Sequence, residues 1–372
     1  MKVLHVYRTY FPDTQGGVQE TVRQISLGTS ELGVSNRIFT PSAGPHPPVL
    51  HHPEGDVHQV KLNFEIASCG FCFTGIPEFK RCVQWADIVH YHFPWPFADA
   101  LHFIANVRKP TLLTYHSDVI RQRVLLALYS PLMKRFLQSA RKIVCTSPNY
   151  LASSKVLKAL GKPCSVIPIG LNRDSYPEVT ESELEQCRQQ HGEGFFLFVG
   201  LLRYYKGLHT LLDAAQLTPH KIVIVGAGPL EDELKEKALK LGLSNVHFTG
   251  YIPDTSKMAL IKLCRALVLP ANLRSEAFGV SLLEGAMNGK PMISTEVGTG
   301  TSFVNIDAET GYVVPPENAR LLADAMNRLA DDPEQAERLG QNALARFESL
   351  FTSRQMAEAY LEEYEQLMGS SS

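Results

Sequence analysis

The sequence lacks several patterns that would assign a chemistry directly. No Asp-x-Asp pair occurs in its 372 residues, so the usual carboxylate clamp that holds a metal ion on a sugar diphosphate is missing. None of the 13 histidines belongs to a His-Glu-x-x-His pattern, which excludes that type of zinc hydrolase. If the chain acts on a diphosphate, groups other than a metal ion must neutralise its charge.

Excess charge and long apolar runs are also missing. The formal net charge is −2, so no overall field attracts nucleic acid, and we expect none to bind. The apolar run within Met1–Val6 is too short for a signal peptide, and no run reaches transmembrane length. We therefore expect a cytoplasmic protein that at most touches a membrane surface.

Cysteines are few, and their spacing does not suggest a set of disulfide bonds. Seven cysteines are scattered along the chain, and an odd number in a chain this long argues against a disulfide framework and for a reducing compartment. Cys69 and Cys72 have the spacing of a metal or redox pair, but no second pair accompanies them. We expect no metal site.

The length and the alternation of apolar and helical patterns predict two domains. A chain of 372 residues is too long for one ordinary core and fits two domains of about 150 to 190 residues. Both halves alternate buried-strand runs with helical patterns, which predicts an α/β fold with doubly wound sheets. The expected parts are residues 1–170, a linker at 171–192, residues 193–351, a final helix at 352–368 and a disordered tail at 369–372.

Two segments of the first half predict surface loops. Residues 44–58 are rich in proline, histidine and glycine, which favours a loop. Residues 64–73 contain three phenylalanines and two cysteines. Exposed aromatics there could meet a lipid, and buried packing is the alternative.

The segment Arg274–Glu284 is the most informative part of the sequence. It follows Ala266–Pro270, an apolar run typical of a buried strand, and it opens a helix that Asn288-Gly289 would end. A helix that begins near Phe278 directs its free amides and positive dipole end into the preceding loop. This arrangement suits an anionic ligand such as a diphosphate.

Two carboxylates flank that expected anion site. At a helical rise of about 1.5 Å per residue, Glu284 would lie roughly 12 Å along from Glu276. At such a separation the two acids could hold hydroxyls at both ends of a nucleotide sugar. The alternative is that both acids belong to a solvated helix face.

The Glu-x7-Glu spacing with Ala277-Phe278-Gly279 after the first acid resembles the signature of the family 4 glycosyltransferases. These are retaining enzymes of the GT-B fold, which has two Rossmann-like domains that face each other across a cleft. The resemblance implies that Glu276 orients the transferred sugar and supports its cationic centre. It also implies that Glu284 binds the ribose and that Ala277, Phe278 and Gly279 contact the donor.

The segment Gly200–Gly207 lies between an expected strand and a helix. Arginine and lysine at a helix start can form a metal-free diphosphate clamp. The family pattern is Gly-Arg-Leu, three residues, Lys-Gly, and Lys206 matches it, whereas Leu201 stands where the arginine is expected. Arg203 lies two residues later, and its phosphate role is inferred from its position. Pairing of Arg203 with a surface acid is the alternative.

Two features of the first half gain meaning from the resemblance. Gly16-Gly17 precedes a helix, and glycines there allow close approach to a phosphate, although a plain turn is the alternative. His116 follows the expected strand Thr111–Tyr115, where it would face a ligand crevice or serve structurally. Family members keep Gly-Gly-Val and a histidine at these places, which implies that Gly16, Gly17 and His116 contact the donor. Residues 1–170 would then bind the acceptor and residues 193–351 the nucleotide sugar.

A partial dinucleotide fingerprint lies in the second half. Gly226-Ala227-Gly228-Pro229 follows an expected strand, but Glu231 replaces the third glycine and no acid ends the next strand. An NAD oxidoreductase is therefore a poor alternative. The resemblance seats the nucleotide base at Gly250-Tyr251-Ile252, so Tyr251 and Ile252 are expected to line it.

The segment Val119–Lys142 is basic and amphipathic. It could lie on an anionic bilayer, where a lipid-linked acceptor would be presented. An ordinary packed helix pair is the alternative.

A narrower resemblance concerns the bacterial mannosyl and D-rhamnosyl transferases that begin polymannose or polyrhamnose O-antigens. It rests on four segments of this chain: Tyr115–Asp118, Arg203–Gly207, Arg274–Glu276 and Gly298–Ser302. It implies retaining α-transfer from GDP-mannose or GDP-D-rhamnose, without another cofactor, in lipopolysaccharide synthesis. The implied acceptor is N-acetylglucosamine on undecaprenyl diphosphate, at the cytoplasmic face of the inner membrane. A GT-B epimerase and a catalytically degenerate subunit, suggested by Leu201, remain alternatives.

Overall fold

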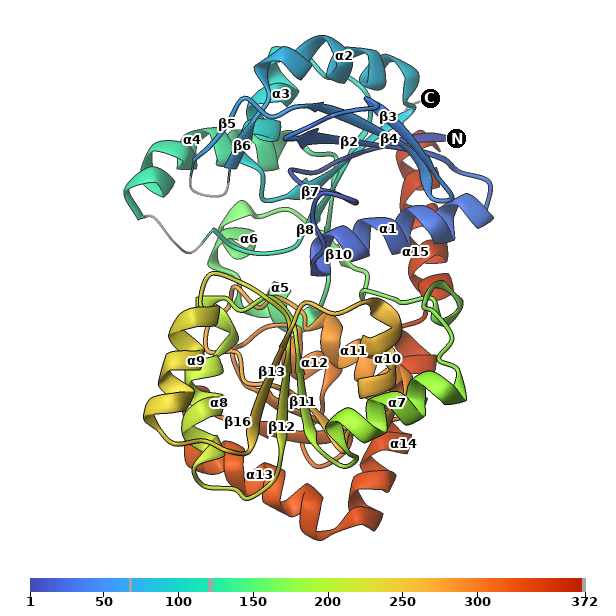
Figure 1. The fold of residues 1–372 in the computed structure, drawn as a ribbon. Coiled ribbons are helices and arrows are strands. Elements are labelled where there is room, and N and C mark those ends of the chain that lie inside the picture. The colour runs from blue at the N-terminus through green and yellow to red at the C-terminus, as the bar shows by residue number, and fades with distance from the viewer. Residues whose placement is uncertain (67–68, 120–122, 370–372) are drawn as a thin grey trace. The chain divides into compact units, whose positions relative to one another are not determined.

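The computed structural model describes residues 1–66, 69–119 and 123–369. The chain divides into two compact units (Figure 1). Unit 1 comprises Met1–Gly170 together with Ser353–Ser372, and unit 2 comprises Leu171–Thr352. The segment expected as a linker, 171–192, is part of unit 2 and contains helix α7 (Glu181–His191). Most of the tail expected to be disordered, residues 370–372, lies outside the described residues.

Unit 1 is built on an eight-stranded sheet in the order β10-β9-β8-β7-β1-β2-β4-β3. Neighbouring strands are parallel except β3 and β4. The central strand β7 is buried along its whole length, as expected for a parallel sheet covered on both faces. The strands are β1 (Lys2–Val6), β2 (Ser35–Ser42), β3 (Val49–His52), β4 (Gly55–Lys61), β7 (Ile88–Phe93), β8 (Thr111–Tyr115), β9 (Lys142–Cys145) and β10 (Cys164–Val166).

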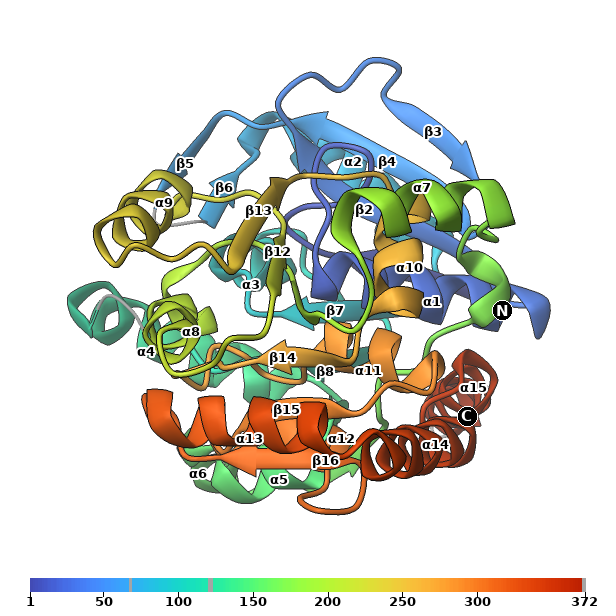
Figure 2. The ribbon, with the colours of Figure 1, turned by 60° about the horizontal axis from the view of Figure 1, so that its bottom comes forward.

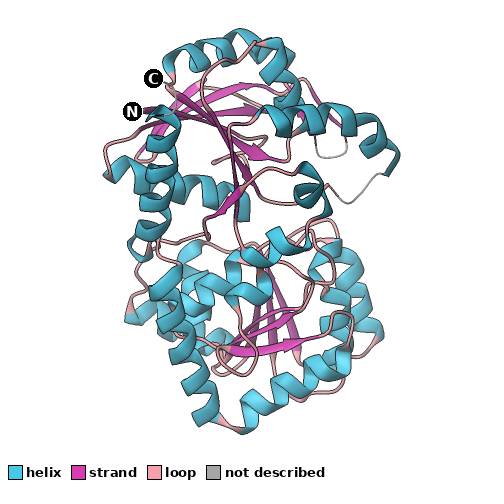
Figure 3. Cartoon of the chain, turned by 180° about the vertical axis from the view of Figure 1, so that it is seen from behind, coloured by secondary structure: helices cyan, strands magenta, loops and turns pink. Residues whose placement is uncertain are grey.

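The last helix of the chain belongs to the core of unit 1. α15 (Ser353–Gly369) lies beside α1 (Gly17–Glu31), as Figures 1 and 3 show. Met356, Tyr360 and Tyr364 of α15 pack in one buried cluster with residues of β1, β7 and β8. The other helices of unit 1 are α2 (Ile76–Trp85), α3 (Pro96–Ile104), α4 (Arg123–Ser139), α5 (Pro148–Ser153) and α6 (Lys155–Leu160).

Both segments of unit 1 that were expected to be surface loops contain strands. The segment 44–58 includes β3 and the start of β4, because its prolines and glycine mark turns at the strand ends and leave the apolar residues between them free to pair. Residues 64–73 include a small antiparallel hairpin of β5 (Phe64–Ile66) and β6 (Cys69–Phe71), and residues 67–68 between them lie outside the described residues.

Unit 2 has a six-stranded, fully parallel sheet in the order β13-β12-β11-β14-β15-β16 (Figure 2). Its first strand is central, and the chain moves outward on one side and then on the other. The connections therefore change sides between β11 and β14, where doubly wound proteins bind ligands. The strands are β11 (Phe196–Val199), β12 (Ile222–Val225), β13 (Val246–Gly250), β14 (Ala266–Leu269), β15 (Met292–Thr295) and β16 (Gly311–Val314).

The helices of unit 2 follow the expected alternation with one difference. The difference is that residues 319–350 form two consecutive helices with no strand between them. The second helix begins at Pro333, and the Asp332 side chain caps it by accepting a hydrogen bond from the backbone N–H of Gln335 at 2.9 Å. Besides α7, the helices are α8 (Leu208–Ala215), α9 (Glu231–Lys240), α10 (Asp254–Leu263), α11 (Val280–Met287), α12 (Thr301–Val304), α13 (Ala319–Asp331) and α14 (Pro333–Leu350).

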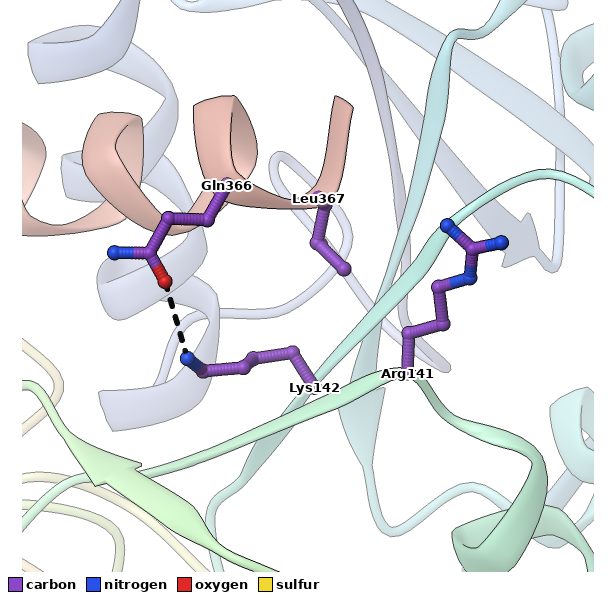
Figure 4. A pocket seen from close by; sticks show the side chains of 4 residues that line it. All are labelled: Arg141, Lys142, Gln366 and Leu367. Carbon is purple, nitrogen blue, oxygen red and sulfur yellow. Dashed lines mark hydrogen bonds between the residues drawn. The ribbon is translucent and has the colours of Figure 1, made fainter. Parts of the chain in front are cut away.

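A pocket of about 310 Å³ lies in unit 1 beside α15 and is lined by Arg141, Lys142, Gln366 and Leu367 (Figure 4). Lys142 pairs with Glu363 at 2.8 Å and donates to Gln366 at 3.4 Å, which ties α15 to the sheet. Because Lys142 begins β9, this pocket lies at the amino end of the strand, away from the edge where ligands of parallel sheets bind.

The part of the chain that the structure describes contains no helix with both the length and the apolar composition needed to span a bilayer.

Candidate functional site

Two loops meet at the switch point of the unit 2 sheet, one after β11 and one after β14. Gly207 ends the first loop with φ +69, and a Cβ there would lie 1.8 Å from the carbonyl oxygen of Pro270. Only glycine allows this approach without displacing the backbone. The backbone N–H of Asn272 also donates to the carbonyl of Tyr205 at 3.0 Å. The two loops are thus held together as one structure.

An ion pair forms between these loops. The Nζ of Lys206 lies 2.5 Å from Oε2 of Glu276, and both side chains are largely buried. Burial alone would lower the pKa of Lys206, but the charge and hydrogen bond of Glu276, together with Tyr205 and Glu284, outweigh it and the net pKa is raised. Lys206 therefore carries its charge at any physiological pH. Two residues that sequence analysis singled out separately are in direct contact.

Glu276 lies before the helix and not on it. Helix α11 begins at Val280, two residues later than expected, because Gly279 adopts φ +92 as its N-cap. The two acids therefore do not lie on one helix, and the separation of about 12 Å, which assumed a continuous helical rise, does not apply to them. The loop that follows β15 holds the loop containing Glu276 in place. The hydroxyl of Thr299 in that loop donates to the backbone carbonyl of Glu276 at 2.7 Å.

The backbone of the three residues after Glu276 lies at the same carboxyl edge of the unit 2 sheet. Phe278 is buried, and its ring packs edge-on against Phe351 at 6.2 Å. The carbonyl of Ala277 accepts the N–H of Gly300 at 2.8 Å. Gly279 has no side chain with which to cap α11, so the first amides of this helix have no side-chain partner at the N-cap and suit an anion.

Glu284 is buried within α11 and has a cationic partner that sequence analysis missed. The Nζ of Lys257 lies 2.8 Å from Oε1 of Glu284 and 2.9 Å from Oδ1 of Asp254. Burial would lower the pKa of Lys257, but these two acids raise it overall. Asp254 precedes Lys257 by three residues on the same helix, so the sequence alone could have indicated this ion pair. Nothing in the sequence connects Lys257 with Glu284.

Arg203 and Leu201 differ in their surroundings. Leu201, which stands where the family has arginine, is 41% exposed. Arg203 is half-buried, its Nε is buried without a hydrogen-bond partner, and no acid pairs with it among the described residues. The guanidinium is thus not engaged by a surface acid.

The residues expected at the nucleotide base lie two strands from β11. Tyr251 follows β13 and is 67% exposed, and Ile252 beside it is half-buried. Both lie at the carboxyl end of the same sheet that carries Lys206 and Glu276. Strand β12 lies between β13, which precedes Tyr251, and β11, which precedes Lys206.

In unit 1 the expected glycines and histidine lie at the carboxyl ends of neighbouring strands. Gly16 is the N-cap of α1, and Gly17 is its first, exposed residue after the β1 loop. His116 follows β8 and is only 4% exposed. Since β1, β7 and β8 are adjacent, these positions share one edge of the sheet.

His116 is the end of a hydrogen-bonded series that sequence analysis missed. Its Nε2 lies 3.0 Å from Nδ1 of His92, and Nε2 of His92 lies 3.0 Å from Nδ1 of His5. The Nε2 of His5 lies 3.1 Å from Oδ1 of Asn36. The strand positions of His5 and His92 are visible in the sequence, but the pairing of their strands is not.

All three imidazoles are neutral at physiological pH. Burial lowers the pKa of His116 to about 3. Burial also lowers the pKa of His5 to about 4, although its bond to Asn36 acts in the opposite direction. The pKa of His92 is lowered well below its ordinary value by burial and by the neighbouring histidines.

Known proteins match the chain over nearly all of its length. The family model "Glycosyltransferase Family 4" matches residues 15–175, and "Glycosyl transferases group 1" matches residues 179–346. The D-rhamnosyltransferase WbpZ of Pseudomonas aeruginosa is 51% identical over 95% of this chain and 93% of its own length. The O-antigen chain mannosyltransferase C of Escherichia coli is 45% identical over the full length of both chains.

A solved structure shows the same fold. The sucrose-phosphate synthase of Thermosynechococcus elongatus superposes with a TM-score of 0.80 at 23% identity, over 99% of both chains. Its identity is too low to indicate more than the fold. Together with two doubly wound units and the transferase relatives, it establishes the architecture. The chain belongs to the family 4 glycosyltransferases and is a glycosyltransferase of the GT-B fold.

Proposed function

We propose that the protein is a retaining α-glycosyltransferase that moves mannose or D-rhamnose from a GDP-sugar to N-acetylglucosamine on undecaprenyl diphosphate, in O-antigen synthesis. The names of the two relatives, at 51% and 45% identity, support the sugar and the pathway. The observation that carries the chemistry is the buried pair of Lys206 and Glu276 at the switch point of unit 2.

Lys206 is proposed to stabilise the departing nucleotide. When the bond between the anomeric carbon and the diphosphate breaks, its electron pair goes to the diphosphate oxygen. A permanently charged lysine, the guanidinium of Arg203, which no acid among the described residues pairs with, and the first amides of α11 can take up this charge without reorganising. The buried setting strengthens each of these interactions.

Glu276 is proposed to orient the transferred sugar. Its carboxylate can accept hydrogen bonds from sugar hydroxyls and favours positive charge developing at the anomeric carbon. The acceptor hydroxyl attacks from the face that the diphosphate leaves, so the α configuration is kept. This role needs no covalent bond between Glu276 and the sugar.

The remaining proposed contacts divide the donor among several loops. Glu284 would accept hydrogen bonds from the ribose hydroxyls, and Lys257 holds its carboxylate in place. Tyr251 and Ile252 would line the base. The further donor contacts that we propose are Gly16, Gly17 and His116 of unit 1 and Ala277, Phe278 and Gly279 of unit 2.

We also propose peripheral contact with the cytoplasmic face of the inner membrane. On α4, Leu128 is 77% exposed and Leu125 is exposed as well, and the exposed cations Lys134 and Arg135 follow on the same helix. Exposed apolar and basic residues on one helix suit an anionic bilayer. Arg121, which belongs to the same basic segment of sequence, lies outside the described residues.

Product analysis tests the proposal. The protein is incubated with GDP-mannose, GDP-D-rhamnose, UDP-glucose or UDP-N-acetylglucosamine and a synthetic lipid-diphosphate N-acetylglucosamine acceptor. We expect mass spectrometry to show one added hexose or deoxyhexose from a GDP-sugar, and NMR to show an α linkage. Transfer from UDP-sugars alone, or a β product, would contradict the proposal. Conversion of the nucleotide sugar in the absence of acceptor would identify an epimerase instead, and neither relative named above is an epimerase.

A further inference from the structure

A single amide at the far end of the histidine series fixes the direction of every hydrogen bond in it. The Nδ2 group of Asn36 lies 2.9 Å from the carbonyl oxygen of Ser26, which can only accept. The amide nitrogen of Asn36 must therefore face Ser26, and its Oδ1 must face His5. Since Oδ1 is an acceptor, the Nε2 of His5 must carry the proton and donate.

That assignment passes from ring to ring. A neutral imidazole has one N–H and one bare nitrogen. If His5 is protonated at Nε2, its Nδ1 is bare and accepts from Nε2 of His92. The Nδ1 of His92 is then bare and accepts from Nε2 of His116. His116 is left with an unprotonated Nδ1.

The series cannot carry protons away from a ligand. A proton taken up at His116 could move through His92 to His5, but the next group is the amide oxygen of Asn36, which is a very weak base. The two hydrogens of the Asn36 Nδ2 group have three acceptors within 3.1 Å, the carbonyl of Ser26 and the hydroxyls of Thr29 and Ser30, which hold the amide in place. The geometry therefore suits a fixed orientation and not a relay.

We propose that Asn36, His5 and His92 are positioning residues that hold His116 in the Nε2–H tautomer, so that its bare Nδ1 accepts a hydrogen bond from a ligand hydroxyl. The ligand class is a polyhydroxylated molecule, which rests on the proposed function, where His116 contacts the sugar donor. No hydrogen bond to Nδ1 of His116 occurs within the described ranges 1–66, 69–119 and 123–369. His116 would therefore select ligands that donate at this point.

The tautomer can be measured without any activity. The full-length protein is labelled with ¹⁵N-histidine, and two-bond ¹H–¹⁵N correlation spectra distinguish a protonated from a bare ring nitrogen. The His116 signals are assigned by their loss in His116→Gln. We expect His116 to carry its proton on Nε2 alone in the free wild-type protein. A proton on Nδ1, or a mixture of tautomers, would overturn the inference.

A matched pair of variants tests the origin of the orientation. His5 and His90 are register partners on β1 and β7, and both are completely buried. His90 bonds to Tyr364 and Thr114 and is not part of the series, although its ring stacks on His92 at 4.3 Å. We expect His5→Phe to give a tautomer mixture at His116 and His90→Phe to leave the Nε2–H form. An unchanged tautomer in His5→Phe would overturn the role of the series.

Donor kinetics separate this inference from the proposed function. In His5→Phe we expect kcat/KM for the donor to fall about tenfold more than in His90→Phe, since a bond to the hydroxyl becomes a clash of two donors. If kcat/KM falls equally in the two variants while the tautomer changes in His5→Phe only, His116 does not form the proposed hydrogen bond with the donor. If His5→Phe does not fold, the tautomer of His116 in the wild-type protein still decides the question, because a proton on Nδ1 would overturn the inference.

Discussion

The Nζ of Lys206 lies 2.5 Å from a carboxylate oxygen of Glu276, although the two residues come from loops that follow different strands. The contact depends on the close approach of Gly207 to Pro270. A charge pair that is buried and fixed in this way is ready to act on a ligand whose charge is being redistributed.

Replacement of Glu276 should remove transfer. We expect Glu276→Ala to lower kcat by about a thousandfold or more, because it removes the sugar contact and leaves Lys206 buried without its anion. Glu276→Gln keeps the shape and should retain slightly more activity. The measurement is initial rate with saturating donor and acceptor, with circular dichroism to verify folding. Wild-type turnover by Glu276→Ala would show that the assignment is wrong.

Replacement of Glu284 should act mainly on donor binding. We expect Glu284→Ala to raise KM for the nucleotide sugar by about tenfold, since hydrogen bonds of a charged group to two hydroxyls are lost, while kcat changes little. Titration calorimetry with the free nucleoside diphosphate should show the same loss. A fall in kcat as large as that of Glu276→Ala, at unchanged nucleotide affinity, would contradict the separation of roles.

The proposed role of Arg203 at the diphosphate can be tested by moving the arginine to position 201, where the family has it. We expect Arg203→Leu to lower kcat by about a hundredfold, because one cation at the leaving diphosphate is lost. The double variant Leu201→Arg/Arg203→Leu should recover part of this loss, since position 201 is exposed enough to accept an arginine. Chelation of divalent ions should leave the wild-type rate unchanged. Full activity of Arg203→Leu would assign the clamp to Lys206 and backbone alone.

The buried histidines of unit 1 should make its stability depend on pH. In the folded protein the pKa of His5 is about 4 and that of His116 about 3, whereas an unfolded histidine titrates near its usual value of about 6.5. Between these values the unfolded chain binds more protons, so stability falls as pH falls below about 6.5. The loss is about 1.4 kcal/mol per pH unit for each such histidine.

Thermal unfolding between pH 7.5 and pH 5 measures this dependence. We expect Tm to be nearly constant above pH 7 and to fall steeply below pH 6. His5→Phe should have a lower Tm at pH 7.5 but a shallower decline toward pH 5. The same steepness in His5→Phe and in the wild type would mean that His5 does not contribute.

The hydroxyl of Tyr364 should stabilise unit 1. It lies 2.7 Å from Nδ1 of His90, and both groups are completely buried. Tyr364→Phe leaves that nitrogen without its partner, and we expect a loss of about 1–3 kcal/mol in the free energy of unfolding. Tyr312→Phe, which removes a partly buried bond to Gln335 in unit 2, should cost less. Urea denaturation compares the two variants.

The sequence was sufficient for most elements that carry the site. Apolar runs such as Ala266–Pro270 mark buried strands directly, and glycine at 207 marks a helix start. The expectation for residues 44–58 was wrong because edge strands carry turn-forming residues and half-exposed side chains, so composition conceals their pairing. The start of α11 differs from the expectation because Gly279 has the left-handed φ of +92 and is the N-cap, and the apolar pattern around it does not indicate that conformation.

Contacts between distant residues limited the prediction of the site. Glu276 and Lys206 were singled out by their motifs, but their ion pair follows from strand order. Lys257 was missed because its partner Glu284 is 27 residues away. His5 and Asn36 likewise acquire a role only when β1, β2 and β7 are placed side by side. Periodicity reports the neighbours of a residue on its own element and contains no information on those across a sheet.

Helix α15 has a consequence for how the protein is made. Its 17 residues are the last of the described chain, yet they complete the core of unit 1, whose strands are synthesised first. While the ribosome is still translating unit 2, the apolar face that α15 will cover is open to solvent and to chaperones. A premature stop codon after residue 352 would therefore damage the half of the protein that had already been synthesised, and leave the recently synthesised half intact.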